Sequence, residues 1–217
     1  MTLVNELIGS SIARLVGVPA PVSVLIDVEP AFLAVAGLPS LSAGLHFGSK
    51  FVADVVGPAR SLISQVSNTS QFAHVIASDA VTNNHDRNND GNFLVRVASD
   101  NPRRLEFVAI DFGHCFGNQW DEGIANMTGW CGNMIPEMAP FIVGEAPFAQ
   151  ASALCSKTEK TTVAEIVQAI PPAWNLTTLK SVAIEGYLFN RLQTVDTLLE
   201  SHRSKFPGWT KKGITKP

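Results

Sequence analysis

Cysteine is scarce in this 217-residue chain, and the three cysteines lie far apart. Cys115, Cys131 and Cys155 form no C-x-x-C pair, so the sequence indicates neither a zinc knuckle nor a disulfide scaffold. Unpaired and widely spaced cysteines are typical of a reducing compartment. We therefore expect a cytoplasmic protein.

The chain also lacks a basic leader and a long uninterrupted apolar run. Its first residues, MTLVNELIG, include Glu6 and no basic residue, whereas a signal peptide begins with positive charge. Asp27 and Glu29 interrupt the apolar region 19–39, so this region is not expected to span a bilayer. The net charge of −3 does not indicate a broad nucleic-acid surface. We expect neither a membrane nor a nucleic acid as a partner, and the oligomeric state is not predicted.

Two motifs of other enzyme classes are missing as well. The sequence contains no G-x-S-x-G, which marks the nucleophile elbow of many hydrolases, and no G-x-G-x-x-G, which binds dinucleotides. His85, His114 and Cys115 have no spacing that suits zinc. The chemistry therefore has to be sought in other residue types.

Apolar periodicity predicts a mixture of helices and strands, which is an α+β chain. The expected helices are residues 3–16, 58–66, 71–82 and 176 to about 202. The expected strands are residues 21–28, 31–36, 92–98 and 105–110, with a loop at 37–48. The last two strands are separated by turn-forming residues, SDNPRR, which predicts a hairpin.

The most unusual segment is NNHDRNNDGNFLVRV, residues 83–97, which is dense in Asp and Asn and then becomes apolar. One interpretation is a calcium loop, because Asp86, Asn88, Asp90 and Gly91 match the pattern D-x-[DN]-x-[DN]-G. The twelfth position of such a loop should be Glu, and here it is Val97. The segment after the loop should be a helix, but it alternates like a strand.

A second interpretation is a phosphoryl-transfer site, which needs one carboxylate near the attacking hydroxyl and oxygen ligands for Mg²⁺. Asp86 can be that carboxylate and Asn92 the first ligand. The predicted hairpin then returns the chain to Asp111, in the triplet Asp111-Phe112-Gly113. Carboxylate and amide oxygens are the ligands that Mg²⁺ prefers. A third interpretation is a polar turn, because Asn, Asp and Gly are the usual residues of turns.

In these motifs the sequence resembles the HipA-like kinase family, which is distantly similar to phosphoinositide and protein kinases. The resembling segments are NELIGSSIARLVGVPAPVSVLIDV, GLHFGSKF, SDAVTNNHDRNNDGNFLV and FVAIDFGHCF. The resemblance implies a kinase-like bilobal fold, with a truncated N-lobe and hinge at residues 1–50 and a mostly helical C-lobe at 51–217. It implies ATP and Mg²⁺ as cofactors and transfer to a protein Ser or Thr hydroxyl. Asp86 would be the catalytic residue, and Asn92 and Asp111 the metal ligands.

Two features depart from the family pattern. The Asn usually follows the catalytic Asp by five residues, but Asn92 follows Asp86 by six, so Asn89 or Asp90 is an alternative ligand. Kinases also present a phosphate-binding Lys on a strand before the first helix, paired with a helix Glu. The first lysine of this chain is Lys50, in the segment that would join the lobes.

Glu6 is the candidate for that helix Glu, although a helical wheel places it opposite the apolar stripe, which predicts a solvated acid. Since no Lys precedes Glu6, a competing function is a kinase-like module that binds nucleotide or a partner without catalysis.

Overall fold

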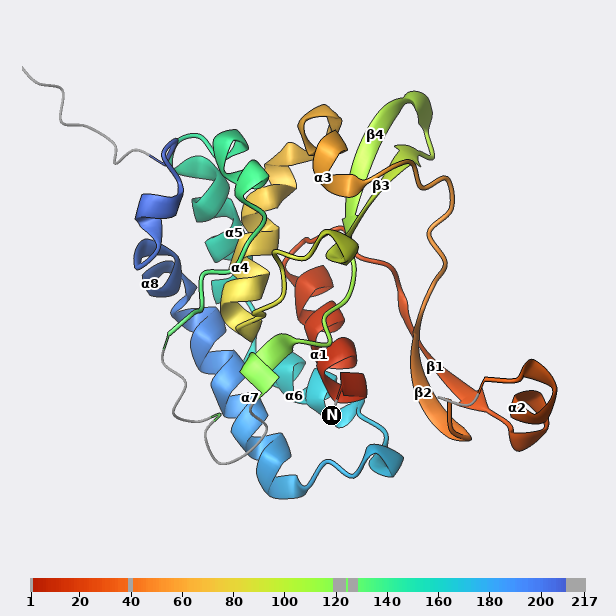
Figure 1. Cartoon of the computed structure of the whole chain (residues 1–217). Coiled ribbons are helices and arrows are strands. Elements are labelled where there is room, and N and C mark those ends of the chain that lie inside the picture. The colour runs from red at the N-terminus through yellow and green to blue at the C-terminus, as the bar shows by residue number, and fades with distance from the viewer. Residues whose placement is uncertain (1, 39–40, 119–123, 125–128, 210–217) are drawn as a thin grey trace, which may run out of the picture.

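A computed structural model describes residues 2–38, 41–118, 124 and 129–209 (Figure 1). The α-helices are α1 (Thr2–Leu15), α2 (Pro30–Ala36), α3 (Ala59–Leu62), α4 (Phe72–Thr82), α5 (Ala146–Ser156), α6 (Lys160–Gln168), α7 (Thr178–Gln193) and α8 (Val195–Glu200). The strands are β1 (Ser23–Val28), β2 (Gly44–Ser49), β3 (Phe93–Ala98) and β4 (Asn101–Ala109). Short 3-10 helices occupy Ile63–Gln65, Thr69–Gln71, Asp90–Asn92, Cys115–Asn118, Pro136–Phe141, Pro172–Trp174 and Arg203–Lys205. The predicted α+β class is therefore confirmed.

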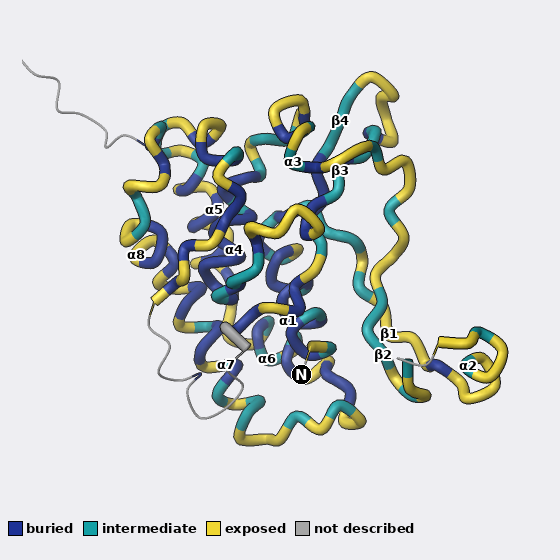
Figure 2. The backbone as a smooth tube through the Cα atoms, in the orientation of Figure 1, coloured by how far each residue is buried: buried dark blue, intermediate teal, exposed yellow. Residues whose placement is uncertain are grey.

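Helices α1 and α4 form the centre of a helical body. Figure 2 shows both as buried, with α5, α7 and α8 around them. The α1 residues Val4, Ile8 and Ile12 are each at most 1% exposed, because their helical spacing places them on one face. Helix α4 is apolar on nearly all sides, as expected of a helix enclosed by others. These two helices confirm the predictions for residues 3–16 and 71–82.

The other predicted helices are present with interruptions. The helix expected at 58–66 is α3 followed by a 3-10 turn at Ile63–Gln65. The helix expected from 176 to about 202 is divided into α7 and α8 at Thr194, whose φ of −116° leaves the helical region. The α7 residues that pack inward include Ile184, Leu188 and Leu192.

Strands β3 and β4 form the predicted hairpin. Their antiparallel register pairs Phe93 with Ala109 and Val95 with Phe107, and all four residues are buried on the face toward the helices. The strand β4 begins at Asn101, earlier than predicted, because the turn uses only Ser99 and Asp100. Backbone pairing continues past the start of β3, where Ile110 N–H donates to the Asn92 carbonyl at 3.1 Å. The polar loop and the segment after β4 therefore meet at one end of the hairpin.

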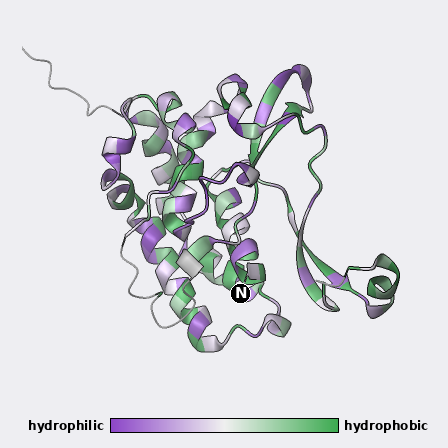
Figure 3. Ribbon diagram, viewed as in Figure 1, coloured by the Kyte–Doolittle hydropathy of each residue, from purple (hydrophilic) through white to green (hydrophobic). Residues whose placement is uncertain are grey.

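Strands β1 and β2 pair with each other and carry α2 at their far end, so that they form an arm projecting from the body (Figure 1). The expected strand at 31–36 is wrong, because Pro30 fits the first turn of a helix and Gly37, with φ 60°, ends it. The expected loop at 37–48 is wrong in its second half, which pairs with β1 as β2. Figure 3 shows apolar residues along this arm, and Val35 on α2 is 90% exposed.

The arm returns to the body at Lys50, whose N–H donates to the Val22 carbonyl at 2.8 Å. Helix α1 packs on α4 of the body, so it is not part of the arm. The division into lobes at about residue 50 stays a prediction. Within the described ranges, no helix is both long and apolar enough to cross a membrane.

Candidate active site

The polar segment after α4 is a compact loop that a buried ion pair holds in place. Helix α4 ends at Asn83, whose φ of 49° reverses the chain. The Arg87 guanidinium lies 2.9 Å from the Asp79 carboxylate, and both side chains are about 1% exposed. Asn84 adds a donated bond to Asp79 at 3.2 Å and accepts one from the backbone N–H of Asp86 at 3.1 Å. The loop conformation around Asp86 is therefore fixed from inside the protein.

The Asn92 amide is bonded directly to Asp86. Its Nδ2 donates to the Asp86 backbone carbonyl at 2.9 Å and to the Asp86 carboxylate at 3.0 Å. Asn92 is 1% exposed, so this arrangement is protected from water. Because the nitrogen is used for Asp86, the amide oxygen is left for another ligand.

Arg87 also connects this loop to the segment after β4. Its Nη1 donates to the Asn92 carbonyl at 3.1 Å and to the Ile110 carbonyl at 2.8 Å. The guanidinium lies over the rings of Phe93 and Phe112, at 5.2 and 4.8 Å from their centroids. One buried cation therefore contacts the residues immediately beside Asn92 and Asp111.

Asp111 directly follows the paired end of the hairpin and adopts a left-handed conformation with φ 56°. A non-glycine residue at such a φ carries backbone strain, and such residues are concentrated at functional sites. Its carboxylate accepts the Gly113 N–H at 3.2 Å and also interacts with the Glu6 carboxyl group, and the residue is exposed. The predicted hairpin thus brings Asp111 back beside the loop that carries Asp86 and Asn92.

Glu6 of α1 is part of this site, so the expectation of a solvated helix acid is wrong. Its Oε2 accepts the Phe112 N–H at 3.0 Å, and the side chain is half-buried. Burial raises the pKa of Glu6, the Phe112 N–H opposes this rise, and the charge of Asp111 raises the pKa further. The helical-wheel prediction is wrong because it assumes that every side chain off the apolar stripe faces solvent. In the folded chain, the segment Asp111-Phe112-Gly113 covers the position of Glu6 on α1.

A cavity of about 820 Å³ opens beside Glu6 and Asp111, and Asp86 and Asn92 are not among the residues that line it. Its lining includes the acids Glu6, Asp54 and Asp111, together with Lys50 and Phe51 from the segment after the arm. Among the described residues that line this cavity, Lys50 is the only basic one. The residue that follows β2 therefore brings a lysine to the same cavity as these carboxylates.

The side chains of the other candidate ligands in the polar segment, Asn89 and Asp90, already contact other residues. Asp90 pairs with Arg60 at 2.9 Å, and the same guanidinium donates to the Asn88 side chain at 2.8 Å. The Asn89 side-chain oxygen accepts the Gly91 N–H at 3.0 Å. Since Arg60 fills the place of a calcium ion and a strand follows the loop, the geometry does not suit an EF-hand.

No group of three His, Cys, Asp or Glu residues gathers as a metal cluster in the described part of the chain. A site built from Asp111 and Asn92 would not be such a cluster, because it consists of one carboxylate and one amide.

Sequence reasoning missed the ion pair of Asp79 and Arg87. Two signals were available. Asp79 interrupts the otherwise apolar sequence of α4, and a buried acid requires a partner. Arg87 is the only basic residue within the segment 86–95, so it is the nearest candidate along the chain.

Comparison with known proteins shows the family and the fold of the chain. The family model described as HipA-like kinase matches residues 1–207. Among solved structures, the crystal structure of a Helicobacter pylori proinflammatory kinase, CtkA, is similar, with a TM-score of 0.54 and 11% sequence identity. The match covers 94% of this chain and 83% of that chain, and at this identity it shows a shared fold alone. No curated protein matches the chain.

Proposed function

Because the chain belongs to the HipA-like kinase family, we propose that it is an ATP- and Mg²⁺-dependent phosphotransferase acting on a protein Ser or Thr hydroxyl in the cytoplasm. The observation that carries this proposal is the meeting of two segments at one end of the hairpin. The bonded pair of Asp86 and Asn92 lies on one segment and Asp111 on the other. This is the arrangement of carboxylate and oxygen ligands that phosphoryl transfer requires.

The donor set fits Mg²⁺. Asp111 offers an exposed carboxylate, and Asn92 offers an amide oxygen whose nitrogen is already held by Asp86. When bound, Mg²⁺ would neutralise the charge of the nucleotide phosphates. Glu6 holds the backbone of Phe112 and so keeps Asp111 oriented toward the cavity. Asn92 is favoured over Asn89 and Asp90, because the side chains of these two already contact Gly91 and Arg60.

Asp86 has the role of accepting the proton of the attacking hydroxyl and positioning its oxygen. The Asn92 N–H fixes one carboxylate oxygen of Asp86, which leaves the other for the acceptor. Lys50 forms no ion pair with any described residue and lines the same cavity as Asp111. Its ammonium can therefore bind the phosphates of a nucleotide held in this cavity.

A second candidate function is a kinase-like module that binds nucleotide without transfer. The observation that favours it is the charge of the cavity, where Lys50 is exposed and is the only basic residue among the described lining residues. A single mobile ammonium neutralises less phosphate charge than a lysine fixed by an acid. This candidate predicts nucleotide affinity with no turnover.

The decisive experiment compares the wild type with Asp86→Asn and Asp111→Ala. Transfer from ATP to a Ser- and Thr-containing protein mixture is measured with Mg²⁺, and nucleotide binding is measured by calorimetry. We expect Asp86→Asn to abolish transfer and keep Mg²⁺–nucleotide binding, because Asp86 faces the acceptor. Asp111→Ala should lose both activities, since it removes a ligand whose charge stabilises the transition state. Asp27→Asn, on the exposed arm, is the matched control.

The outcomes separate the candidate functions. Full transfer by Asp86→Asn would remove the kinase role of this residue. Nucleotide binding by all proteins with no transfer by the wild type would favour the binding module. A parallel titration with Ca²⁺ tests the calcium loop, which predicts binding that Asp86→Asn weakens.

A further inference from the structure

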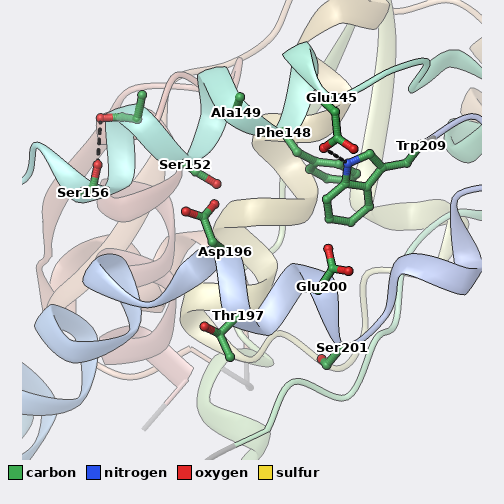
Figure 4. A pocket seen from close by; sticks show the side chains of 11 residues that line it. Glu145, Phe148, Ala149, Ser152, Ser156, Asp196, Thr197, Glu200, Ser201 and Trp209 are labelled. Atoms are coloured by element: carbon green, nitrogen blue, oxygen red, sulfur yellow. Dashed lines mark hydrogen bonds between the residues drawn. The ribbon is translucent and has the colours of Figure 1, made fainter. Parts of the chain in front are cut away.

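A second cavity, of about 860 Å³, lies between α5 and α8 on a different part of the body (Figure 4). None of the residues that line it also lines the cavity beside Asp111. Its walls combine carboxylates and hydroxyl groups with two aromatic rings, and the proposed phosphoryl transfer uses none of them.

One end of this cavity is an aromatic wall whose neighbouring acids are already paired. Phe148 and Trp209 pack with their ring centroids 4.4 Å apart. The Trp209 indole N–H donates to Glu145 at 2.6 Å, and Arg203 bridges Glu145 and Glu200 at 2.5 and 2.8 Å. Since Arg203 contacts both of these carboxylates, this end of the cavity offers a rigid apolar surface beside acids that are held in place.

The other end has two polar groups without partners. Ser152 is 5% exposed, and its hydroxyl forms no hydrogen bond with any described residue. The Asp196 carboxylate forms no ion pair within the described part of the chain. Figure 4 shows the Ser152 hydroxyl and the Asp196 carboxylate directed into the same space. A buried hydroxyl without a partner is destabilising, so its presence requires an explanation.

The usual explanation for a helical serine does not apply to Ser152. Such hydroxyls commonly donate to a carbonyl in the preceding turn, as Ser156 of the same helix donates to Ala153 at 3.4 Å. Ser152 makes no such bond and instead lines the cavity. Asp196 is an exposed residue of α8, and its carboxylate is the acid at this end of the cavity.

We propose that this cavity binds an ammonium or guanidinium group carried on an apolar stem. Asp196 neutralises the positive charge, the Ser152 oxygen accepts one N–H, and the stem packs on Phe148 and Trp209. Lysine and arginine side chains have this chemistry, and so do small free amines. The source is therefore either a basic residue of a bound protein segment or a free cation. The proposal stands independently of the kinase activity.

Calorimetric titration of the full chain with butylguanidinium, to about 10 mM, tests the site, since one small group binds with at best millimolar affinity. Butylurea, which has the same shape without the charge, is the neutral probe. Acetyl-Gly-Arg-Gly-amide presents the same cation on a peptide. The indole N–H signal of Trp209, assigned by Trp209→Phe, reports where the probe binds.

We expect butylguanidinium to bind and to shift the Trp209 signal, and butylurea not to bind. Asp196→Asn should weaken binding about ten-fold, the effect of one charged hydrogen bond. Asp27→Asn, an exposed aspartate on the arm, should leave binding unchanged. Ser152→Ala should fold as well as the wild type, because it removes an unpaired hydroxyl, and should weaken binding several-fold.

Tighter binding of the peptide than of butylguanidinium would identify a protein segment as the source, and the reverse order would identify a small cation. Equal binding by the wild type and a folded Asp196→Asn would overturn the proposal. So would binding of butylurea as tightly as butylguanidinium, or no binding of either cationic probe.

Discussion

Replacing Arg87 by methionine tests how the candidate site is held together. Arg87 is fully buried and is the ion-pair partner of Asp79, whose side chain is 1% exposed. Burial raises the pKa of Asp79, and the charge and hydrogen bond of Arg87 oppose that rise. Arg87→Met removes this opposition and leaves an acid enclosed by apolar side chains.

The cost of this change follows from the protonation of Asp79. Without Arg87, Asp79 avoids a buried charge by taking up a proton. Protonation at pH 7 of an acid with an ordinary pKa of about 3.9 costs about 1.36 kcal/mol per pH unit, or about 4 kcal/mol in total. Loss of one partner of a buried ion pair typically costs about 3–5 kcal/mol, which agrees with this value. Since burial already raises the pKa of Asp79 in the wild type, we expect Arg87→Met to lower the free energy of unfolding at pH 7 by at most about 4 kcal/mol.

The same reasoning fixes the sign of the pH dependence. In the variant, the folded-state pKa of Asp79 lies far above its unfolded value. Its contribution to stability is therefore full below about pH 4 and is lost as the pH rises. The deficit relative to the wild type should shrink by up to about 2.7 kcal/mol between pH 7 and pH 5.

Urea unfolding of both proteins at pH 5 and pH 7 measures this deficit. The double variant D79N/R87M is the control, because an amide at position 79 carries no charge and needs no proton. It should recover most of the lost stability at pH 7. A deficit that is the same at both pH values would refute the reasoning, as would a double variant no more stable than Arg87→Met.

Three further predictions concern residues around the same site. Asn92→Ala should lower Mg²⁺-dependent turnover by about 100-fold, since it removes an oxygen ligand and the bond that fixes Asp86, whereas Asn89→Ala should stay within a few-fold in the same assay. The pKa of Glu6 is raised in the folded state, so the wild type loses stability as the pH rises from 4 to 7. Glu6→Gln has no carboxylate at this position and should therefore gain stability relative to the wild type over the same range. Thermal unfolding of both proteins in the absence of metal measures this difference. Gly9→Ala should destabilise by about 1–3 kcal/mol, because the added carbon would lie 2.6 Å from Phe112. The matched Gly186→Ala meets nothing within 4 Å and should stabilise by about 0.5–1 kcal/mol in the same denaturation experiment.

The elements that sequence alone predicted are those whose formation depends on local pattern. Helices α1 and α4 follow from apolar spacing, and the hairpin follows from alternation around SDNPRR. The arm was only half predicted. Its second strand, GLHFGS, has little apolar alternation and forms by pairing with β1, which is a contact between distant residues. The segment PAFLAVA has apolar residues that suit a strand, but Pro30 and Gly37 define a helix.

The candidate site was predicted as a set of residues, and its internal organisation was not. Asp86, Asn92 and Asp111 were found because their order along the chain and the length of the hairpin are sequence properties. Glu6, Asp79 and Arg87 were missed or misplaced because their roles depend on which side of a helix is covered by another segment.

The extra residue between Asp86 and Asn92 shows why both kinds of information are needed. Sequence spacing alone leaves Asn89, Asp90 and Asn92 as possible ligands. The contacts of Arg87 favour Asn92. Arg87 holds the Asn92 carbonyl beside the start of β3, and the Asn92 side chain is thereby directed toward Asp86. Asn89 and Asp90 lie on the exposed side of the loop, where Gly91 and Arg60 occupy them. A loop of six residues can therefore replace one of five, because a buried cation fixes its end and the added residue is accommodated at the surface.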